Sequence, residues 1–182
     1  GIPKGGIPFH PYYTVHDLLG VGVFFFIFFI VVFFFPEMGG LFLEKPNFEP
    51  ANALKTPAHI APVWYFTPFY AMLRAVTVDF MGLPAKFWGV VVMGGAIAIL
   101  FVLPWLDRSP VRSIRYKGWL SKIAVAIFAV SFVILGYLGL VPATEGRTTV
   151  AQILTVLYFL YFILMPFYTR MENTKPVPER VT

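Results

Sequence analysis

The run Leu18–Phe35, with the sequence LLGVGVFFFIFFIVVFFF, contains no charged or hydrogen-bonding side chain. A helix of about this length crosses the roughly 30 Å hydrocarbon core of a bilayer. Lipid offers no partners for backbone N–H and C=O groups, so a segment that crosses it must satisfy them internally as a helix. The run lacks the period-2 alternation of a membrane barrel strand. We therefore expect a transmembrane helix over residues 18–35.

Three further apolar runs are long enough to cross the bilayer: Phe87–Leu106, Ile123–Val141 and Val150–Tyr168. The chain is 58% hydrophobic and only 13% charged, with a mean hydropathy of +0.76. This composition lies outside the ordinary soluble class. There is no internal repeat. We therefore predict an all-α integral membrane protein in which residues 1–182 form one region, with four transmembrane helices at about 18–35, 87–106, 123–141 and 150–168.

The connection Pro36–Lys86 is far longer than a usual loop, and such loops are commonly functional. It contains Thr56-Pro57-Ala58-His59-Ile60-Ala61-Pro62-Val63-Trp64-Tyr65-Phe66. Prolines fix φ and remove backbone donors, so Pro57 favours an extended entry and Pro62 the start of a short helix. We expect that helix to lie at the membrane surface, between the first and second spans.

The short helix is crowded with aromatic residues: Trp64, Tyr65, Phe66, Phe69 and Tyr70. One interpretation is an interfacial belt, because Trp and Tyr accumulate at membrane surfaces. The other is the wall of a binding site for a flat ring, since such a site needs apolar walls and a few oriented polar groups. The two tyrosines and the nearby Arg74 would supply those polar groups.

The charges predict how the chain crosses the membrane. The segment Asp107–Lys122 carries five basic residues and one acidic residue, the densest positive cluster in the sequence. By the positive-inside rule this loop is cytoplasmic, and four crossings then place both termini on the same side. Basic and aromatic residues interleave too sparsely to indicate nucleic-acid binding.

The residues able to hold a metal are few. The chain has no cysteine, and His10, His16 and His59 all lie outside the four apolar runs. A heme within the bilayer needs axial ligands from helices inside it, so this chain is not expected to ligate one, and no metal site is predicted. His59 fits best as a structural histidine of the loop.

The segment Thr14-Val15-His16-Asp17 precedes the first run and resembles a capping box, with Thr14 as the cap. His16 and Asp17 would then form a titratable pair near the membrane surface, able to deliver protons to a bound ligand. The alternative is a helix cap with a neighbouring side chain that extends to the interface. The residues alone do not decide between these two interpretations.

The motif Pro62-Val63-Trp64-Tyr65 resembles the Pro-Glu-Trp-Tyr signature of cytochrome b in quinol:cytochrome c oxidoreductases. The resemblance continues on both sides of the motif and covers nearly the whole chain. The matching segments are Gly1–Pro3, Ile7–Thr14, Pro50–Asn52, Thr56–Pro57, His59–Ile60 and Leu73–Arg74. They are similar to the C-terminal half of that subunit, with one departure at Val63, where the family usually carries glutamate.

The resemblance implies two sites. The quinol-oxidation site would include Pro62, Val63, Trp64, Tyr65, Phe66 and Tyr70, with Met93 and Ile97 of the second run opposite. The quinone-reduction site would include Phe9, His16 and Asp17, because the family uses an aspartate at the position that matches Asp17. His16 stands where the family usually has lysine.

The resemblance also implies a membrane subunit of a respiratory quinol:cytochrome c oxidoreductase, which is not catalytic alone. Its cofactors would be quinone and quinol, with heme b ligated by the missing half. Expected partners are the N-terminal half of cytochrome b, a Rieske iron-sulfur protein and a cytochrome c-type subunit, in a dimeric complex of the bacterial inner membrane. We interpret the chain, which begins at Gly1, as a fragment of something longer.

Two alternatives are a subunit of a photosynthetic-type cytochrome complex and a non-redox membrane scaffold subunit. The first would lack the segment Ile7–Asp17 and the fourth span, and both are present. The second would favour discontinuous helices or charges in mid-membrane, and the centres of the four runs carry no charge.

Overall fold

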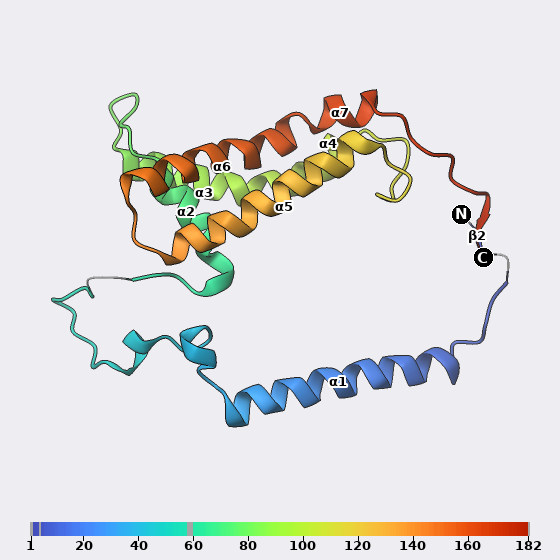
Figure 1. The fold of residues 1–182 in the computed structure, drawn as a ribbon, viewed down its shortest axis with the longest axis horizontal. Helices are drawn as coiled ribbons and strands as arrows, with labels where there is room; N and C mark the ends of the chain where they lie inside the picture. Colours follow the sequence, from blue (N-terminus) through green and yellow to red (C-terminus); the bar gives the residue numbers. More distant parts are fainter. Residues whose placement is uncertain (1, 4, 58–59, 182) are drawn as a thin grey trace. The chain divides into compact units, whose positions relative to one another are not determined.

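The computed structural model describes residues 2–3, 5–57 and 60–181, and the chain forms two compact units. The first unit comprises Gly1–Pro57 with Val177–Thr182, and the second comprises Ala58–Pro176. The predicted fold class is confirmed, because four helices are long and apolar enough to cross a membrane (Figure 1). They are Tyr12–Phe34, Ala85–Leu106, Trp119–Leu140 and Glu145–Ile163.

The first unit contains one long helix and several short elements. They are β1 (Ile2–Pro3), α1 (Tyr12–Phe34), the 3-10 turns η1 (Met38–Gly40) and η2 (Lys45–Phe48), and β2 (Arg180–Val181). β1 pairs with β2 in parallel, with Ile2 opposite Arg180. After α1 the chain turns through Gly39 and Gly40, whose φ angles of +67° and +96° favour glycine.

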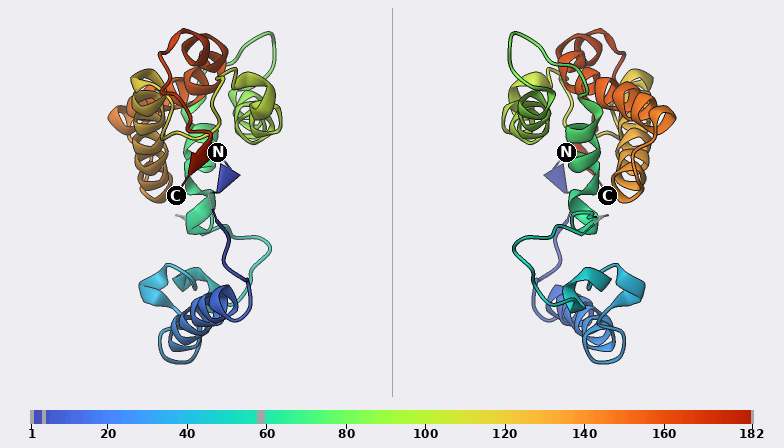
Figure 2. Two further views of the ribbon diagram at one scale, coloured as in Figure 1. Left: turned by 90° about the vertical axis from the view of Figure 1, so that its right-hand side faces the viewer. Right: turned by 90° about the vertical axis from the view of Figure 1, so that its left-hand side faces the viewer.

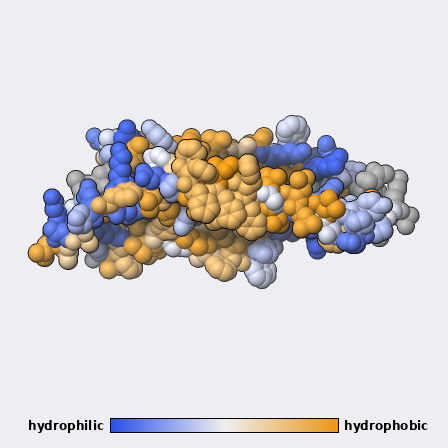
Figure 3. All heavy atoms as spheres, turned by 90° about the horizontal axis from the view of Figure 1, so that it is seen from below, coloured by the Kyte–Doolittle hydropathy of each residue, from blue (hydrophilic) through white to orange (hydrophobic). Residues whose placement is uncertain are grey.

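α1 is largely exposed, and none of its described residues is fully buried. The face drawn in Figure 3 is hydrophobic along its middle, with hydrophilic residues toward both ends. Phe25, Phe29 and Phe33 stack at four-residue spacing, with ring centroids 5.8 Å apart at each step. Within its unit the helix is therefore stabilised by its own backbone bonds and by ring contacts between successive turns.

The predicted capping role of Thr14 is wrong. α1 begins at Tyr12, directly after Pro11, and has no side-chain cap. The carbonyl of Phe9 already accepts hydrogen bonds from the amides of Tyr13 (2.8 Å) and Thr14 (3.2 Å), so the first turn forms before Thr14 could cap it. The Thr14 hydroxyl instead lies 3.2 Å from Nδ1 of His10.

The second unit is a helical bundle. Its elements are η3 (Trp64–Phe66), α2 (Thr67–Ala75), α3 (Ala85–Ala98), η4 (Ile99–Val102), α4 (Leu103–Leu106), α5 (Trp119–Leu140), α6 (Glu145–Ile163) and α7 (Met165–Met171). α3, η4 and α4 follow one another without a break and form a single span. α2 is the predicted short helix of the long connection. It lies between α3 on one side and α5 and α6 on the other (Figure 2).

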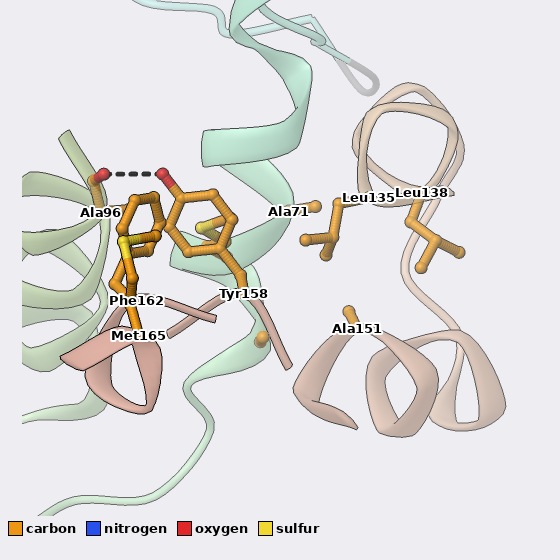
Figure 4. Close-up of a cluster of buried hydrophobic side chains, with 10 residues drawn as sticks. Ala71, Ala96, Leu135, Leu138, Ala151, Tyr158, Phe162 and Met165 are labelled. Carbon is orange, nitrogen blue, oxygen red and sulfur yellow. Dashed lines mark hydrogen bonds between the residues drawn. The ribbon is translucent and has the colours of Figure 1, made fainter. Parts of the chain in front are cut away.

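The core of this unit is built from aromatic and small side chains around α2. Tyr158, Phe162, Met72 and Leu135 are the largest apolar side chains that are fully buried. Figure 4 shows Tyr158 and Phe162 directed toward α3, where the Tyr158 hydroxyl donates to the carbonyl oxygen of Ala96 at 2.8 Å. A buried phenol needs such a partner, so this bond fixes α6 against α3.

Two glycines allow α2 to approach its neighbours closely. A Cβ at Gly139 of α5 would lie 2.1 Å from the carbonyl oxygen of Thr67, and one at Gly89 of α3 would lie 2.6 Å from that of Leu73. No side chain fits at either distance. Gly89 therefore permits close packing of α3 on α2, whereas a Cβ at Gly94 would meet no described atom within 4 Å.

The basic loop between α4 and α5 is attached to the segment that follows α6. Lys117 forms an ion pair with Asp107. Glu172 accepts hydrogen bonds from the amide (3.1 Å) and the hydroxyl (2.8 Å) of Ser121 in the first turn of α5. The amide of Lys175 also donates to the Tyr116 carbonyl at 2.7 Å. Both carboxylates at this end thus have protein partners.

Candidate functional site

The turn at residues 62–66 is fixed by short-range bonds. Val63 is extended, and its carbonyl accepts from the amide of Phe66 at 2.8 Å, which closes η3. The Thr67 hydroxyl donates to the Trp64 carbonyl at 2.8 Å. Pro68 occupies the first turn of α2, where its missing N–H costs no helical hydrogen bond. Proline and threonine therefore set the direction in which the turn enters α2.

The turn presents three side chains outward. Val63 is 38% exposed, Trp64 47% and Tyr65 62%. The rings of Trp64 and Tyr65 meet edge to face, with centroids 5.5 Å apart. Phe66 is less exposed and contacts Phe69, whose ring meets Phe132 of α5. Trp64 and Tyr65 thus form an exposed aromatic surface, and Phe66 and Phe69 beneath it pack against α5.

Tyr70 and Arg74 lie on α2 behind this surface. The Arg74 guanidinium stands over the Tyr70 ring, 4.6 Å from its centroid. The same group donates to the carbonyls of Leu138 (2.5 Å) and Val141 (3.1 Å) at the end of α5. Sequence reasoning placed Arg74 beside the aromatic cluster, but its partners are 64 and 67 residues away along the chain and carried no sequence signal.

Met93 and Ile97 lie on α3. Met93 follows Gly89 by one turn and shares the side of α3 that faces α2, whereas Ile97 follows one further turn on and is 38% exposed. Sequence reasoning did not include Thr67 in the site, although it ties Trp64 to α2. A threonine three residues after a tryptophan carbonyl at a helix start is the signal that would have indicated it.

Phe9, His16 and Asp17 belong to the other unit, at the start of α1. The Phe9 ring stacks on Tyr13 (6.3 Å between centroids), and Tyr13 meets the edge of His16 at 5.8 Å. Asp17 follows on the same exposed first turns. Tyr13 therefore links two of the three predicted residues. It was missed, although its spacing of three and four residues from His16 and Asp17 is that of neighbours on a helix face.

Asp79 is the carboxylate nearest the motif within the second unit by sequence, and it has a structural partner. Its Oδ1 accepts from the amide of Ala85, the first residue of α3, at 2.6 Å. Glu49 directly follows η2 in the first unit. His59 lies outside the described residues.

The described residues do not fit a bis-histidine heme. One correction applies to the histidines: because α1 starts at Tyr12, His16 lies inside a spanning helix, in its second turn. It is the only histidine in the four spans, and two facing ligands are required. Among the described residues, no group of three or more His, Asp or Glu side chains is placed to hold a metal ion.

The fold and the turn together define a multi-pass, all-helical membrane protein with an exposed aromatic turn between its first and second spans. Residues 50–159 match the family described as Cytochrome b(C-terminal)/b6/petD. The chain belongs to this cytochrome b family.

Individual relatives agree. Cytochrome b of Allochromatium vinosum is 66% identical over 99% of this chain and 43% of its own length. Cytochrome b of Rhodospirillum rubrum is 46% identical over 99% of this chain and 42% of its own length. A solved structure titled Hyperthermophilic respiratory Complex III superimposes with a TM-score of 0.81 at 38% identity, covering 94% of this chain and 41% of that chain. This chain thus spans less than half the length of the relatives that it matches.

Proposed function

We propose that this chain is the C-terminal part of cytochrome b in a bacterial respiratory quinol:cytochrome c oxidoreductase. It would contribute to a quinol-oxidation site at Pro62–Tyr70 and to a quinone-reduction site at the start of α1. The observation that carries the proposal is the exposed pair Trp64 and Tyr65, held on a turn whose base is packed against α5. Exposed rings fixed in place offer a flat ligand a surface that loses little entropy on binding.

In the first site, Val63 and Trp64 would pack against the ring and the Tyr65 hydroxyl would donate a hydrogen bond to it. Oxidation of a quinol releases two electrons and two protons. Val63 has no titratable group and accepts neither proton, so the base must lie elsewhere. We propose Asp79 or Glu49, or a group outside this chain. Asp79 already accepts the Ala85 amide, so it would have to combine proton transfer with that bond.

In the second site, His16 and Asp17 would supply protons and the rings of Phe9 and Tyr13 would bound the ligand. An imidazole and a carboxyl group can each pass a proton between water and a bound ligand within hydrogen-bond reach. Heme b, the Rieske protein and a cytochrome c-type subunit would be held outside this chain. The basic loop supports a cytoplasmic position for the start of α1 and an opposite position for Pro62–Tyr70.

The test of the first site is Tyr65→Phe in the complete complex. Loss of one hydrogen bond to the substrate is expected to lower kcat/KM for quinol oxidation roughly tenfold, the effect of about 1.4 kcal/mol. Tyr137→Phe, which changes an exposed tyrosine of α5, is the matched control and should have no effect. Wild-type rates in Tyr65→Phe would argue for an interfacial belt instead.

The test of the second site is Asp17→Asn, which removes one proton donor and keeps the side-chain shape. Quinone reduction, followed as reverse electron entry into the heme on that side, should slow severalfold. Quinol oxidation at the other site should be unchanged. If both reactions keep their wild-type rates, Asp17 has only a structural role at the start of α1.

A further inference from the structure

The short helix α2 is fixed to α5 at both of its ends. At its start, the carbonyl of Thr67 lies so close to Gly139 that no side chain fits between them. At its end, the Arg74 guanidinium donates to the carbonyls of Leu138 and Val141. Figure 4 shows Ala71, between these two points on α2, facing Leu135 and Leu138 of α5. α2 therefore has little freedom to slide along α5.

Arginine suits the second attachment for a physical reason. The last carbonyls of a helix have no partner within it, and they carry the negative end of the macrodipole. Leu138 lies in the last turn of α5 and Val141 is its C-cap. One planar guanidinium supplies two donors to them and remains charged at any physiological pH. The attachment thus joins a permanent cation to a helix end that attracts one.

The same two contacts lead to the candidate quinol site. Thr67, which packs against Gly139, donates to the Trp64 carbonyl. Arg74, which holds the end of α5, stands over the ring of Tyr70. Trp64 is therefore linked to α5 through Thr67, and Tyr70 is linked to α5 through Arg74.

Stability alone does not account for arginine at this position. Its Nε–H is buried and has no hydrogen-bond partner among the described residues. An unpaired buried donor is destabilising. A lysine ammonium, which also carries several donors on one nitrogen, could reach the carbonyls without this defect, but it could not cover the Tyr70 ring with a plane. The feature that only arginine provides is the flat contact with Tyr70, made while the same group binds the end of α5.

We propose that Arg74 is a positioning residue of the quinol-oxidation site: it sets the place of α2 on α5 and so holds Tyr70 and the Trp64–Tyr65 turn in their binding geometry. Arg74 acts through Tyr70 and α2, without contact to the substrate. This inference rests on the proposed quinol-oxidation function.

The experiment compares R74Q, R74K and R147Q in the complete complex, with KM for quinol, kcat and the amount of assembled complex measured for each. R147Q is the matched control, because Arg147 is exposed in the first turn of α6 and its guanidinium donates to the carbonyl of Pro142 in the preceding loop. KM should rise about tenfold in R74Q, as expected for losing hydrogen bonds from a charged group, with a smaller change in kcat. R74K should fall between R74Q and wild type, and R147Q should match wild type.

Two outcomes would overturn the inference. One is an unchanged KM in R74Q at normal assembly. The other is a loss of assembled complex with wild-type KM in the complex that remains, which would leave Arg74 a purely stabilising role. If R74Q does not assemble, the KM of R74K decides in the same way. If Tyr65→Phe lowers kcat/KM and R74Q leaves KM unchanged, only the positioning role fails; if neither has an effect, the proposed site itself fails.

Discussion

α1 and α6 show two different ways in which a span of this protein obtains its structure. α1 is the most hydrophobic of the four spans, and none of its described residues is buried. α6 is the least hydrophobic, and it buries Ala151, Thr155, Tyr158 and Phe162. Hydropathy therefore predicts which segments enter the membrane, but not which of them pack together.

The reason lies in the solvent. Between helices in lipid there is no hydrophobic driving force, because acyl chains are as apolar as leucine, so association depends on close packing and interhelical hydrogen bonds. In α6, Gln152 donates to the Ala75 carbonyl at 2.9 Å and Tyr158 to that of Ala96 at 2.8 Å. Within its unit, α6 is held by these bonds because its polar groups have partners on other segments of the same unit.

Gly139→Ala should destabilise the second unit most strongly, because it disrupts the packing of α2 on α5. The new Cβ would lie 2.1 Å from the Thr67 carbonyl, so α2 must move away from α5. Overpacking of this kind costs about 1–3 kcal/mol, occasionally more. Gly22→Ala in α1, where a Cβ meets no described atom within 4 Å, is the control. Thermal unfolding of the complex should shift down for Gly139→Ala only; equal midpoints would show that α2 is not held by close packing.

Glu172→Ala should have the next largest effect. The Glu172 carboxylate binds the amide and hydroxyl of Ser121, at the positive end of the α5 dipole. Losing a capping interaction costs about 0.5–2 kcal/mol. Glu179→Ala removes the same charge beyond α7 and is the control. Hydrogen exchange of the first turn of α5 should accelerate in Glu172→Ala, and unchanged exchange would contradict the capping role.

Tyr158→Phe should have the smallest effect of the three. It removes the hydroxyl that binds the Ala96 carbonyl and keeps the ring. Interhelical hydrogen bonds in membranes contribute on average about 0.6 kcal/mol. The midpoint of thermal unfolding should therefore fall slightly, and Tyr12→Phe in α1, whose ring is 59% exposed, should leave it unchanged. A large fall in Tyr158→Phe would mean that hydrogen bonding outweighs packing in this bundle.

The four spans could be predicted from the sequence because composition over a whole run decides them. Their ends could not, because helices continue into the interface, where polar residues are tolerated. The first span starts at Tyr12 instead of Leu18. The fourth starts at Glu145, where Thr144 accepts the Arg147 amide as a cap, and ends at Ile163, shortly before Pro166 in the first turn of α7.

The exposed part of the candidate site could also be predicted, because Pro62–Tyr65 is a contiguous motif. The supports behind it could not. Gly139 packs on Thr67, and Arg74 binds Leu138, across more than sixty residues of sequence, and such pairs follow from tertiary packing alone. The assignment of the site residues to quinol and quinone binding stays a prediction.

The short link between α5 and α6 has a consequence for biosynthesis. α5 ends at Leu140 and α6 begins at Glu145, so the two helices form a hairpin. α1 is apolar enough to partition from the translocon on its own, whereas α6 carries Glu145, Arg147 and Gln152 near its start and gains less from lipid. We expect α6 to enter the bilayer together with α5, as one inserting hairpin. Polar residues such as Gln152 would then both make α6 depend on α5 for insertion and bind α6 to α2 in the folded unit.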